Sequence, residues 1–225
     1  MAIETMAAAM KLLDVFDSSE LQDPLNENWA ARRALTEATR KLIANMVTCS
    51  NDTQELSQVA AVINEQAEKL VQGPRLQGRA AYEKTAVNGD FARLCYELSP
   101  LDGKSNPIAA PITVWTEGER IYGRANMGWQ YEGPYQSVHG GFVAALFDQL
   151  LGAGQKLTGQ PGFTGTLTVK YLKLTPLNTE LKMEGWVERI EGRKNYLAGE
   201  IWAGDKKTAT CEAIFISPVS LKVGH

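Results

Sequence analysis

The stretch that decides the fold is HGGFVAALFDQLLG, residues 139–152. It places two glycines directly after a histidine and a single carboxylate, Asp148, inside an apolar run. Glycines at the start of a helix leave backbone N–H groups uncovered, so an oxygen atom of a ligand can approach them. A carboxylate in a buried helix is costly unless it has a partner or a task. The stretch therefore predicts a buried helix with open donors at its start and one acid with a particular role.

Length, composition and charge exclude several classes of protein. The chain has 225 residues, 44% hydrophobic and 22% charged, which fits one good-sized globular domain with an extension. The formal net charge is -3, so the chain lacks the basic balance that is typical of nucleic-acid binders. No apolar run reaches about 18 residues, the length that indicates a membrane span. The first residues carry no basic region before an apolar core, so we expect no signal peptide and a cytoplasmic protein.

The cysteines and histidines predict neither a disulfide framework nor a metal centre. The three cysteines, Cys49, Cys95 and Cys211, are odd in number and lie far apart. Of the two histidines, one is the last residue of the chain, so a histidine-rich metal site is not expected. We therefore expect no metal and no redox cofactor.

The first third of the chain is predicted to be helical. Apolar residues follow a helical stripe over residues 31–47, and a second stripe runs over residues 56–70. Asp52 with Glu55 resembles a capping box that opens the second helix. We assign residues 1–75 to an N-terminal helical region whose stripes are expected to be packing faces. Residues 76–110, rich in glycine and proline, are assigned to a connector.

After Pro111 the hydrophobic pattern changes to a period of two, which indicates strands. The helix predicted at residues 140–157 lies between two groups of these strands. This order predicts an α+β domain over residues 111–218, with one antiparallel sheet around one helix. The period-two segments are 112–127 with a turn at its centre, 163–174, 181–190, 196–203 and 208–216. In the segment 163–174 the alternation places Thr164 on the polar face.

The domain of residues 111–218 resembles the hotdog-fold acyl-CoA thioesterases. Within them it is most similar to the phenylacetate-pathway (PaaI-like) group, which has an aspartate on the central helix. The resemblance rests on GPYQSVHGGFVAALFDQLLG followed by TGTLTVKYLKLTPL, with nine residues from His139 to Asp148. Two positions depart from the family pattern. Gly133 stands where some members have asparagine, and Leu172-Lys173-Leu174 replaces a common Arg-Pro or Lys-Pro.

The resemblance implies hydrolysis of a thioester, and it implies roles for four residues. Asp148 would be the general base or the nucleophile, and the Gly140 N–H would hold the developing oxyanion at the helix N-terminus. Thr164 matches a position where some relatives orient the attacking water. His139 would mainly shape the turn into the helix. Structural readings stay open: a tight turn for Gly140, a local ion pair or cap for Asp148, and an ordinary strand threonine for Thr164.

The helix itself demands a second subunit if Gly140 and Asp148 serve one carbonyl. Eight residues separate them, which is about 12 Å along a helix at roughly 1.5 Å per residue. Two antiparallel helices related by a two-fold axis bring Gly140 of one subunit to Asp148 of the other. The sequence thus predicts a homodimer, or a dimer of dimers, with active sites at the interface.

A further set of residues is expected to bind the substrate, an acyl-CoA or an acylated carrier protein. Gly141 and Gln149 flank the proposed catalytic groups on the helix. Lys173, Arg193 and Lys194 lie near strand ends and hairpin tips, where they are candidates for the phosphates of coenzyme A. Charged residues at such places are also commonly only solvated.

Three alternatives to a thioesterase remain open at this point. A non-catalytic hotdog module can bind acyl-CoA as a regulatory ligand. A hotdog dehydratase uses a histidine and an acid close together at the start of the helix, unlike the spacing here. A scaffold could use the N-terminal helices to bind a partner and would not need Asp148.

Overall fold

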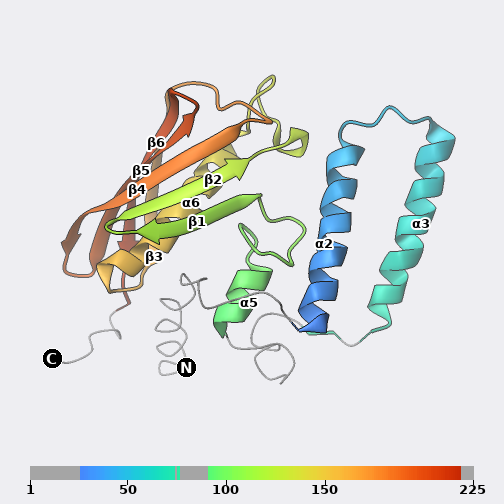
Figure 1. Ribbon diagram of the computed structural model, residues 1–225, viewed down its shortest axis with the longest axis horizontal. Coiled ribbons are helices and arrows are strands. Elements are labelled where there is room, and N and C mark those ends of the chain that lie inside the picture. The colour runs from blue at the N-terminus through green and yellow to red at the C-terminus, as the bar shows by residue number, and fades with distance from the viewer. Residues whose placement is uncertain (1–25, 74, 77–90, 219–225) are drawn as a thin grey trace.

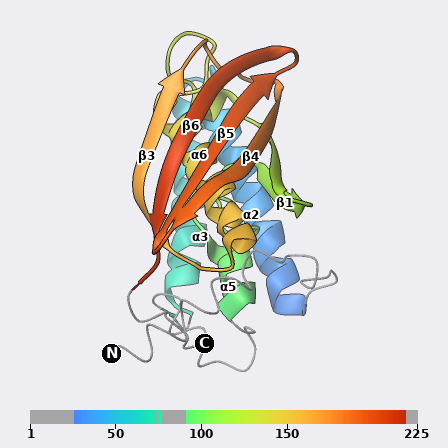
Figure 2. The ribbon, with the colours of Figure 1, turned by 90° about the vertical axis from the view of Figure 1, so that its left-hand side faces the viewer.

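The computed structural model describes residues 26–73, 75–76 and 91–218. Figure 1 and Figure 2 show a curved antiparallel sheet wrapped around one long helix, with a pair of helices standing to one side. This confirms the predicted α+β hotdog fold. The elements of the sheet domain are β1 (Ile112–Glu117), β2 (Arg120–Asn126), α6 (Gly140–Gly154), β3 (Phe163–Tyr171), β4 (Glu180–Glu191), β5 (Lys194–Ala203) and β6 (Lys206–Ile216).

The six strands lie in the order β1-β2-β4-β5-β6-β3. The hairpins β1–β2, β4–β5 and β5–β6 turn through glycines with positive φ, at Gly118, Gly192 and Gly204. L side chains rarely adopt that backbone conformation, so glycine is favoured at each turn. After α6 the chain returns to pair β3 with β6. This leaves β3 as an edge strand of the sheet.

The central helix α6 supplies much of the core. Because the sheet curls around it, most of the circumference of α6 is apolar, which explains why the apolar run in the sequence is interrupted only at Asp148 and Gln149. Burying each large side chain of this kind contributes about 1.5–3 kcal/mol. The fully buried side chains of α6 are Val143, Leu146, Phe147, Leu150 and Leu151. The side of α6 next to β3 carries Asp148 and stays only half-buried.

The two helices predicted in the first third of the chain are present. They are α2 (Glu27–Met46) and α3 (Thr53–Val71). The Asp52 side chain caps α3 by accepting a hydrogen bond from the Glu55 N–H at 2.9 Å, as the capping-box pattern predicts. None of the described helices is both long and apolar enough to cross a membrane.

The apolar stripe of α3 does not pack on the sheet domain in the described single chain, so its role as a packing face stays a prediction. Leu56 and Val59 remain about half exposed and Leu70 is 64% exposed. Figure 1 shows the reason, because α3 lies on the far side of α2 from the sheet.

The segment expected to be a connector contains a further helix, α5 (Phe91–Leu98). Glu97 on α5 is fully buried and accepts two hydrogen bonds from Arg33 of α2, at 2.8 and 3.2 Å. Ser105 donates a third to Glu97 at 2.7 Å, and Arg93 lies 3.7 Å away. Arg40 of α2 donates to the carbonyl oxygens of Gly103 and Asn106. These contacts fix α2 to the segment that precedes β1.

We predict that Glu97→Gln lowers the free energy of unfolding by about 1–3 kcal/mol, because two arginines then lose a buried counter-charge. Urea denaturation followed by circular dichroism measures the change. The control is Glu65→Gln, which breaks an exposed i,i+4 pair with Lys69 and should cost less than about 0.5 kcal/mol. Equal effects of the two substitutions would contradict this account of how α2 is held.

Candidate active site

Asp148 and Thr164 meet across the gap between α6 and β3. The Thr164 hydroxyl donates a hydrogen bond to Asp148 Oδ1 at 2.9 Å. This hydrogen bond holds one oxygen of the carboxylate in place. Because Asp148 is only half-buried, other groups can still reach the carboxylate. Carboxylates held by a hydroxyl in this way are suited to accept a proton from a third group. The sequence named both residues, and the structure brings them together.

Thr164 does not lie on the polar face, so that prediction from the alternation is wrong. The pairing of β3 with β6 shifts between Thr164 and Thr166, which marks a β-bulge at Gly165. A bulge inserts one residue and reverses which face the neighbouring side chains occupy. Thr164 therefore lies opposite the buried Phe215 and faces α6.

The start of α6 leaves one backbone donor uncovered. His139 caps the helix by accepting a hydrogen bond from the Gly141 N–H at its Nδ1, 3.0 Å away. The N–H groups of Phe142 and Val143 both donate to the His139 carbonyl oxygen. Within the described part of the chain, no acceptor pairs with the Gly140 N–H. The cap thus occupies the neighbouring donors and leaves that of Gly140 available at the positive end of the helix dipole.

Gly140 is also placed against β3. The Tyr171 hydroxyl donates to the Gly140 carbonyl oxygen at 2.9 Å. A Cβ added to Gly140 would meet the Tyr171 ring at 3.4 Å, in ordinary contact. Tyr171 is the tyrosine of the quoted stretch TGTLTVKYLKLTPL, and its hydroxyl joins β3 to the start of the helix.

Gly133 departs from the family pattern for a steric reason. A Cβ at this position would lie 2.5 Å from the His139 Cα, which is too close for any side chain. The Gly133 N–H donates to Ser137, and the His139 N–H donates to Tyr131. This tight loop positions the His139 cap, which matches the expectation that His139 shapes the turn.

Gln149 has a partner outside the predicted site. Its side-chain amide donates to Asp102 Oδ2 at 2.7 Å, so it contacts the segment before β1. Burial raises the pKa of Asp102 above its ordinary value. Sequence reasoning missed Asp102, because its position in a turn-rich segment gives no periodic signal. A substrate-binding role for Gln149 and Gly141 stays a prediction.

The three basic residues proposed for phosphate binding do not cluster in one subunit. Lys173 follows the Tyr171 end of β3, where its N–H donates to Thr208. Arg193 and Lys194 lie at the opposite end of the sheet, where Lys194 pairs with Ile216 and Ile216 with Phe163. The sequence could not show this separation, since it depends on the direction of β3 beside β6.

Cys211 lies on β6 with its side chain buried near Asp148, and it could be mistaken for a nucleophile. It is 2% exposed, and burial with the nearby Asp148 charge raises its pKa to about 12. The thiolate is the reactive form of cysteine, so this thiol is inert at neutral pH. No group of three metal-ligating side chains occurs among the described residues.

Comparison with known proteins finds similarity to thioesterases. Residues 135–210 match the thioesterase superfamily. Acyl-coenzyme A thioesterase THEM4 of Xenopus laevis is 35% identical over 82 residues, which are 36% of this chain and 37% of the relative. Acyl-coenzyme A thioesterase THEM5 of Homo sapiens is 30% identical over 81 residues, which are 36% of this chain and 33% of the relative. The chain thus spans about a third of the length of these curated relatives.

A solved structure extends the similarity beyond the sheet domain. A thioesterase superfamily protein of known crystal structure is 25% identical with a TM-score of 0.70, covering 86% of this chain and 97% of its own. Such coverage cannot be confined to residues 112–216, so the N-terminal region is partly shared. Fold and site together define a hotdog domain with an acid on its central helix. Over residues 135–210 the chain is similar to the thioesterase superfamily.

We predict that Ellman's reagent modifies one thiol of the native protein quickly, at the exposed Cys49. The two buried thiols, Cys95 and Cys211, should react only after denaturation, when all three cysteines are counted. Raising the pH from 7 to 10 should not make Cys211 reactive, because its pKa of about 12 keeps the thiol in the neutral form, which reacts slowly with the reagent. Rapid modification of a Cys49→Ser variant at pH 8 would contradict this burial.

Proposed function

We propose that this protein is a thioesterase that hydrolyses an acyl-CoA to the free acid and coenzyme A. The observation that carries the proposal is the hydrogen bond of 2.9 Å between Thr164 of β3 and Asp148 of α6. The same helix α6 begins at Gly140, whose N–H is open. An acylated carrier protein is the alternative substrate. No metal or redox cofactor enters the reaction. The assignments to the phenylacetate-pathway group and to the cytoplasm stay predictions.

The chemistry needs a base and an oxyanion donor on opposite sides of one carbonyl. Asp148 removes a proton from a water molecule whose oxygen attacks the thioester carbon. The carbonyl oxygen then carries negative charge, which the Gly140 N–H stabilises with the helix dipole. Collapse of the tetrahedral intermediate breaks the C–S bond. The leaving thiolate takes up the proton held by Asp148, and the carboxylic acid is released.

The edge position of β3 supports assembly of this site from two subunits. Thr164 and Asp148 meet near one end of β3, and Tyr171 and Gly140 meet at the other. The two ends are roughly 20 Å apart at about 3.3 Å per strand residue. An exposed edge strand is a template for pairing with another strand. Antiparallel pairing of two copies of β3 about their middle would place Asp148 of one subunit beside the partner's Gly140.

The open face of α6 suits the same assembly. It carries Gly141, Ala144, Asp148 and Gly152, which repeat at helical spacing and are all small apart from the acid. A Cβ added to Gly152 would meet nothing within 4 Å, so the space beside this face is empty. Small residues allow a second helix to approach closely, and that approach would enclose Asp148 and strengthen its electrostatic interactions.

The same two-fold pairing would also unite the separated basic residues. Lys173 lies at the Tyr171 end of β3, and Arg193 with Lys194 lies at the Phe163 end. Antiparallel pairing brings one end of β3 beside the opposite end of its copy. The three basic side chains would then flank a single active site, as the phosphates of coenzyme A require.

We predict that Asp148→Asn lowers kcat by about a hundredfold or more, the size expected when a general base is lost. Release of free thiol from a panel of acyl-CoAs, from acetyl to palmitoyl with phenylacetyl and benzoyl, measures the rate. The matched control is Asp102→Asn, a carboxylate that contacts α6 without facing Thr164, and its kcat should stay within about threefold. Equal rates for both variants and the wild type would contradict the role of Asp148, whereas no turnover by the wild type would favour a non-catalytic acyl-CoA-binding module.

We predict that Thr164→Val lowers kcat by about tenfold, because Asp148 loses the hydroxyl that orients it. Thr164→Ser keeps a donor and should restore most of the rate, whereas KM should change little in both variants. Steady-state kinetics with the best acyl-CoA of the panel separates kcat from KM. A serine variant as slow as the valine variant would show that packing, rather than the hydrogen bond, matters at this position.

A further inference from the structure

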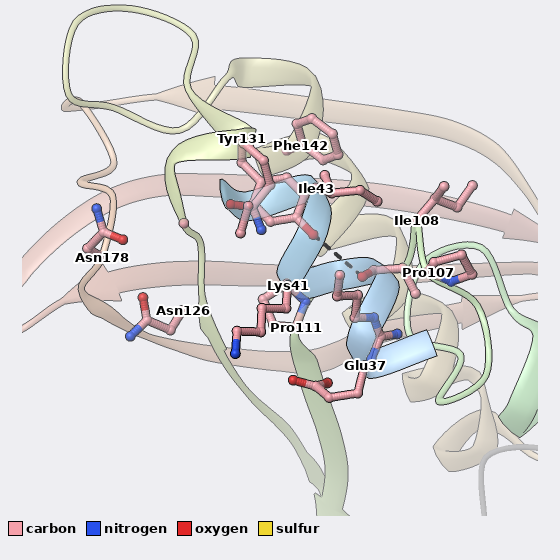
Figure 3. A pocket seen from close by; sticks show the side chains of 15 residues that line it. Glu37, Lys41, Ile43, Pro107, Ile108, Pro111, Asn126, Tyr131, Phe142 and Asn178 are labelled. Carbon is pink, nitrogen blue, oxygen red and sulfur yellow. Dashed lines mark hydrogen bonds between the residues drawn. The ribbon is translucent and has the colours of Figure 1, made fainter. Parts of the chain in front are cut away.

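Between α2 and the sheet domain lies a cavity of about 620 Å³ that the catalytic steps do not use. Its volume falls within the range of about 300–1,000 Å³ that is usual for small-molecule sites. Ile43 and Ala44 of α2 line one side, and Tyr131 and Phe142 of the sheet domain line another. Figure 3 shows Ile43 close to Tyr131 and Phe142, with Ile108 on a further wall.

The apolar end of the cavity adjoins the open donor of α6. Phe142 stands in the first turn of α6, two residues after Gly140. Tyr131 is tied to the same turn, because its carbonyl oxygen accepts a hydrogen bond from the His139 N–H at 2.9 Å. The Tyr131 and Phe142 rings pack edge to face with their centroids 4.8 Å apart. A group bound at the Gly140 N–H therefore has this apolar wall within one helical turn.

The other end of the cavity is charged. Glu37 and Lys41 of α2 line it and are exposed, and Figure 3 shows them away from Tyr131 and Phe142. Burial against the apolar walls would stabilise the binding of an apolar chain that enters from the α6 side. Binding would become weaker where the end of the chain displaced water from these charges.

We propose that this cavity binds the acyl chain of the substrate and that α2 sets the length of chain accepted. The inference rests on the proposed function, since it places the thioester carbonyl at the Gly140 N–H. The chain would run from that carbonyl past Phe142 and along Ile43 to the charged rim. The ligand class is therefore an apolar acyl group, and its carrier stays outside the cavity.

The attachment of α2 makes its wall a fixed one. Arg40, which also lines the cavity, donates to two carbonyl oxygens of the segment before β1, at 2.7 and 2.8 Å. About two helical turns before Arg40, Arg33 is bound to the buried Glu97. A wall held by such contacts cannot retreat to admit longer chains, which gives the selectivity a sharp limit.

The test compares two variants that change the cavity in opposite directions. Ala44→Phe fills it and Ile43→Ala enlarges it, while Ala38→Phe changes an exposed position of α2 that does not line it. For the wild type, kcat/KM should rise about fourfold per added methylene until the cavity is full. Ala44→Phe should lose about tenfold or more on chains at the wild-type optimum and prefer shorter ones. Ile43→Ala should move the optimum to longer chains, and Ala38→Phe should leave the profile unchanged.

A profile that is identical in wild type, Ala44→Phe and Ile43→Ala would overturn the assignment of the cavity while leaving the thioesterase proposal intact. If the wild type hydrolyses no acyl-CoA, the proposed function fails, and calorimetry with free decanoic acid then decides about the cavity. Binding that is lost in Ala44→Phe and kept in Ala38→Phe would support an acyl site. No binding to the wild type would overturn it.

Discussion

The structure depends on one constraint, the enclosure of α6 by a single curved sheet. The sheet buries most faces of the helix, so its sequence is almost wholly apolar, and the first turn and the side next to β3 are left for chemistry. Asp148 lies on that open side and Gly140 at the first turn. Both groups then touch β3, through Thr164 at one end and Tyr171 at the other. A rigid, buried scaffold thus carries the proposed base and the proposed donor in defined, accessible positions.

The same enclosure limits what a single subunit can do. The proposed base and the proposed donor lie about 12 Å apart along α6, and a straight helix cannot bring them closer. The unpaired edge of β3 and the small residues on the open face of α6 both favour a second copy as the solution. The N-terminal helix α2 adds a separate function in this account, because it walls a cavity beside the donor end of α6. Catalysis would then depend on α6 and β3, and acyl selectivity would depend on α2.

Much of this arrangement could be predicted from the sequence. The run from His139 to Gly152 identified the central helix, and the period-two segments identified the strands, because both patterns report burial directly. The errors have physical causes of other kinds. The bulge at Gly165 turns Thr164 toward Asp148, and strict alternation contains no sign of it. The short helix α5 is defined by tertiary contacts such as Arg33 with Glu97. The role of the α3 stripe stays a prediction, because the stripe has no partner in the described single chain. Helical periodicity shows that a face is apolar and cannot show what covers it.

The most direct test of the account is complementation between two inactive variants. Asp148→Asn removes the proposed base, and Gly140→Pro removes the proposed N–H donor at the first helical position, where proline is tolerated. Each variant alone should be inactive. Refolding equal amounts of the two variants should give a mixture with about a quarter of the wild-type rate, since about half of the dimers are mixed and each has one of its two sites intact. Mixed dimers isolated with two affinity tags should have about half of the wild-type rate. Mixed dimers that remain inactive would contradict an active site shared between two subunits.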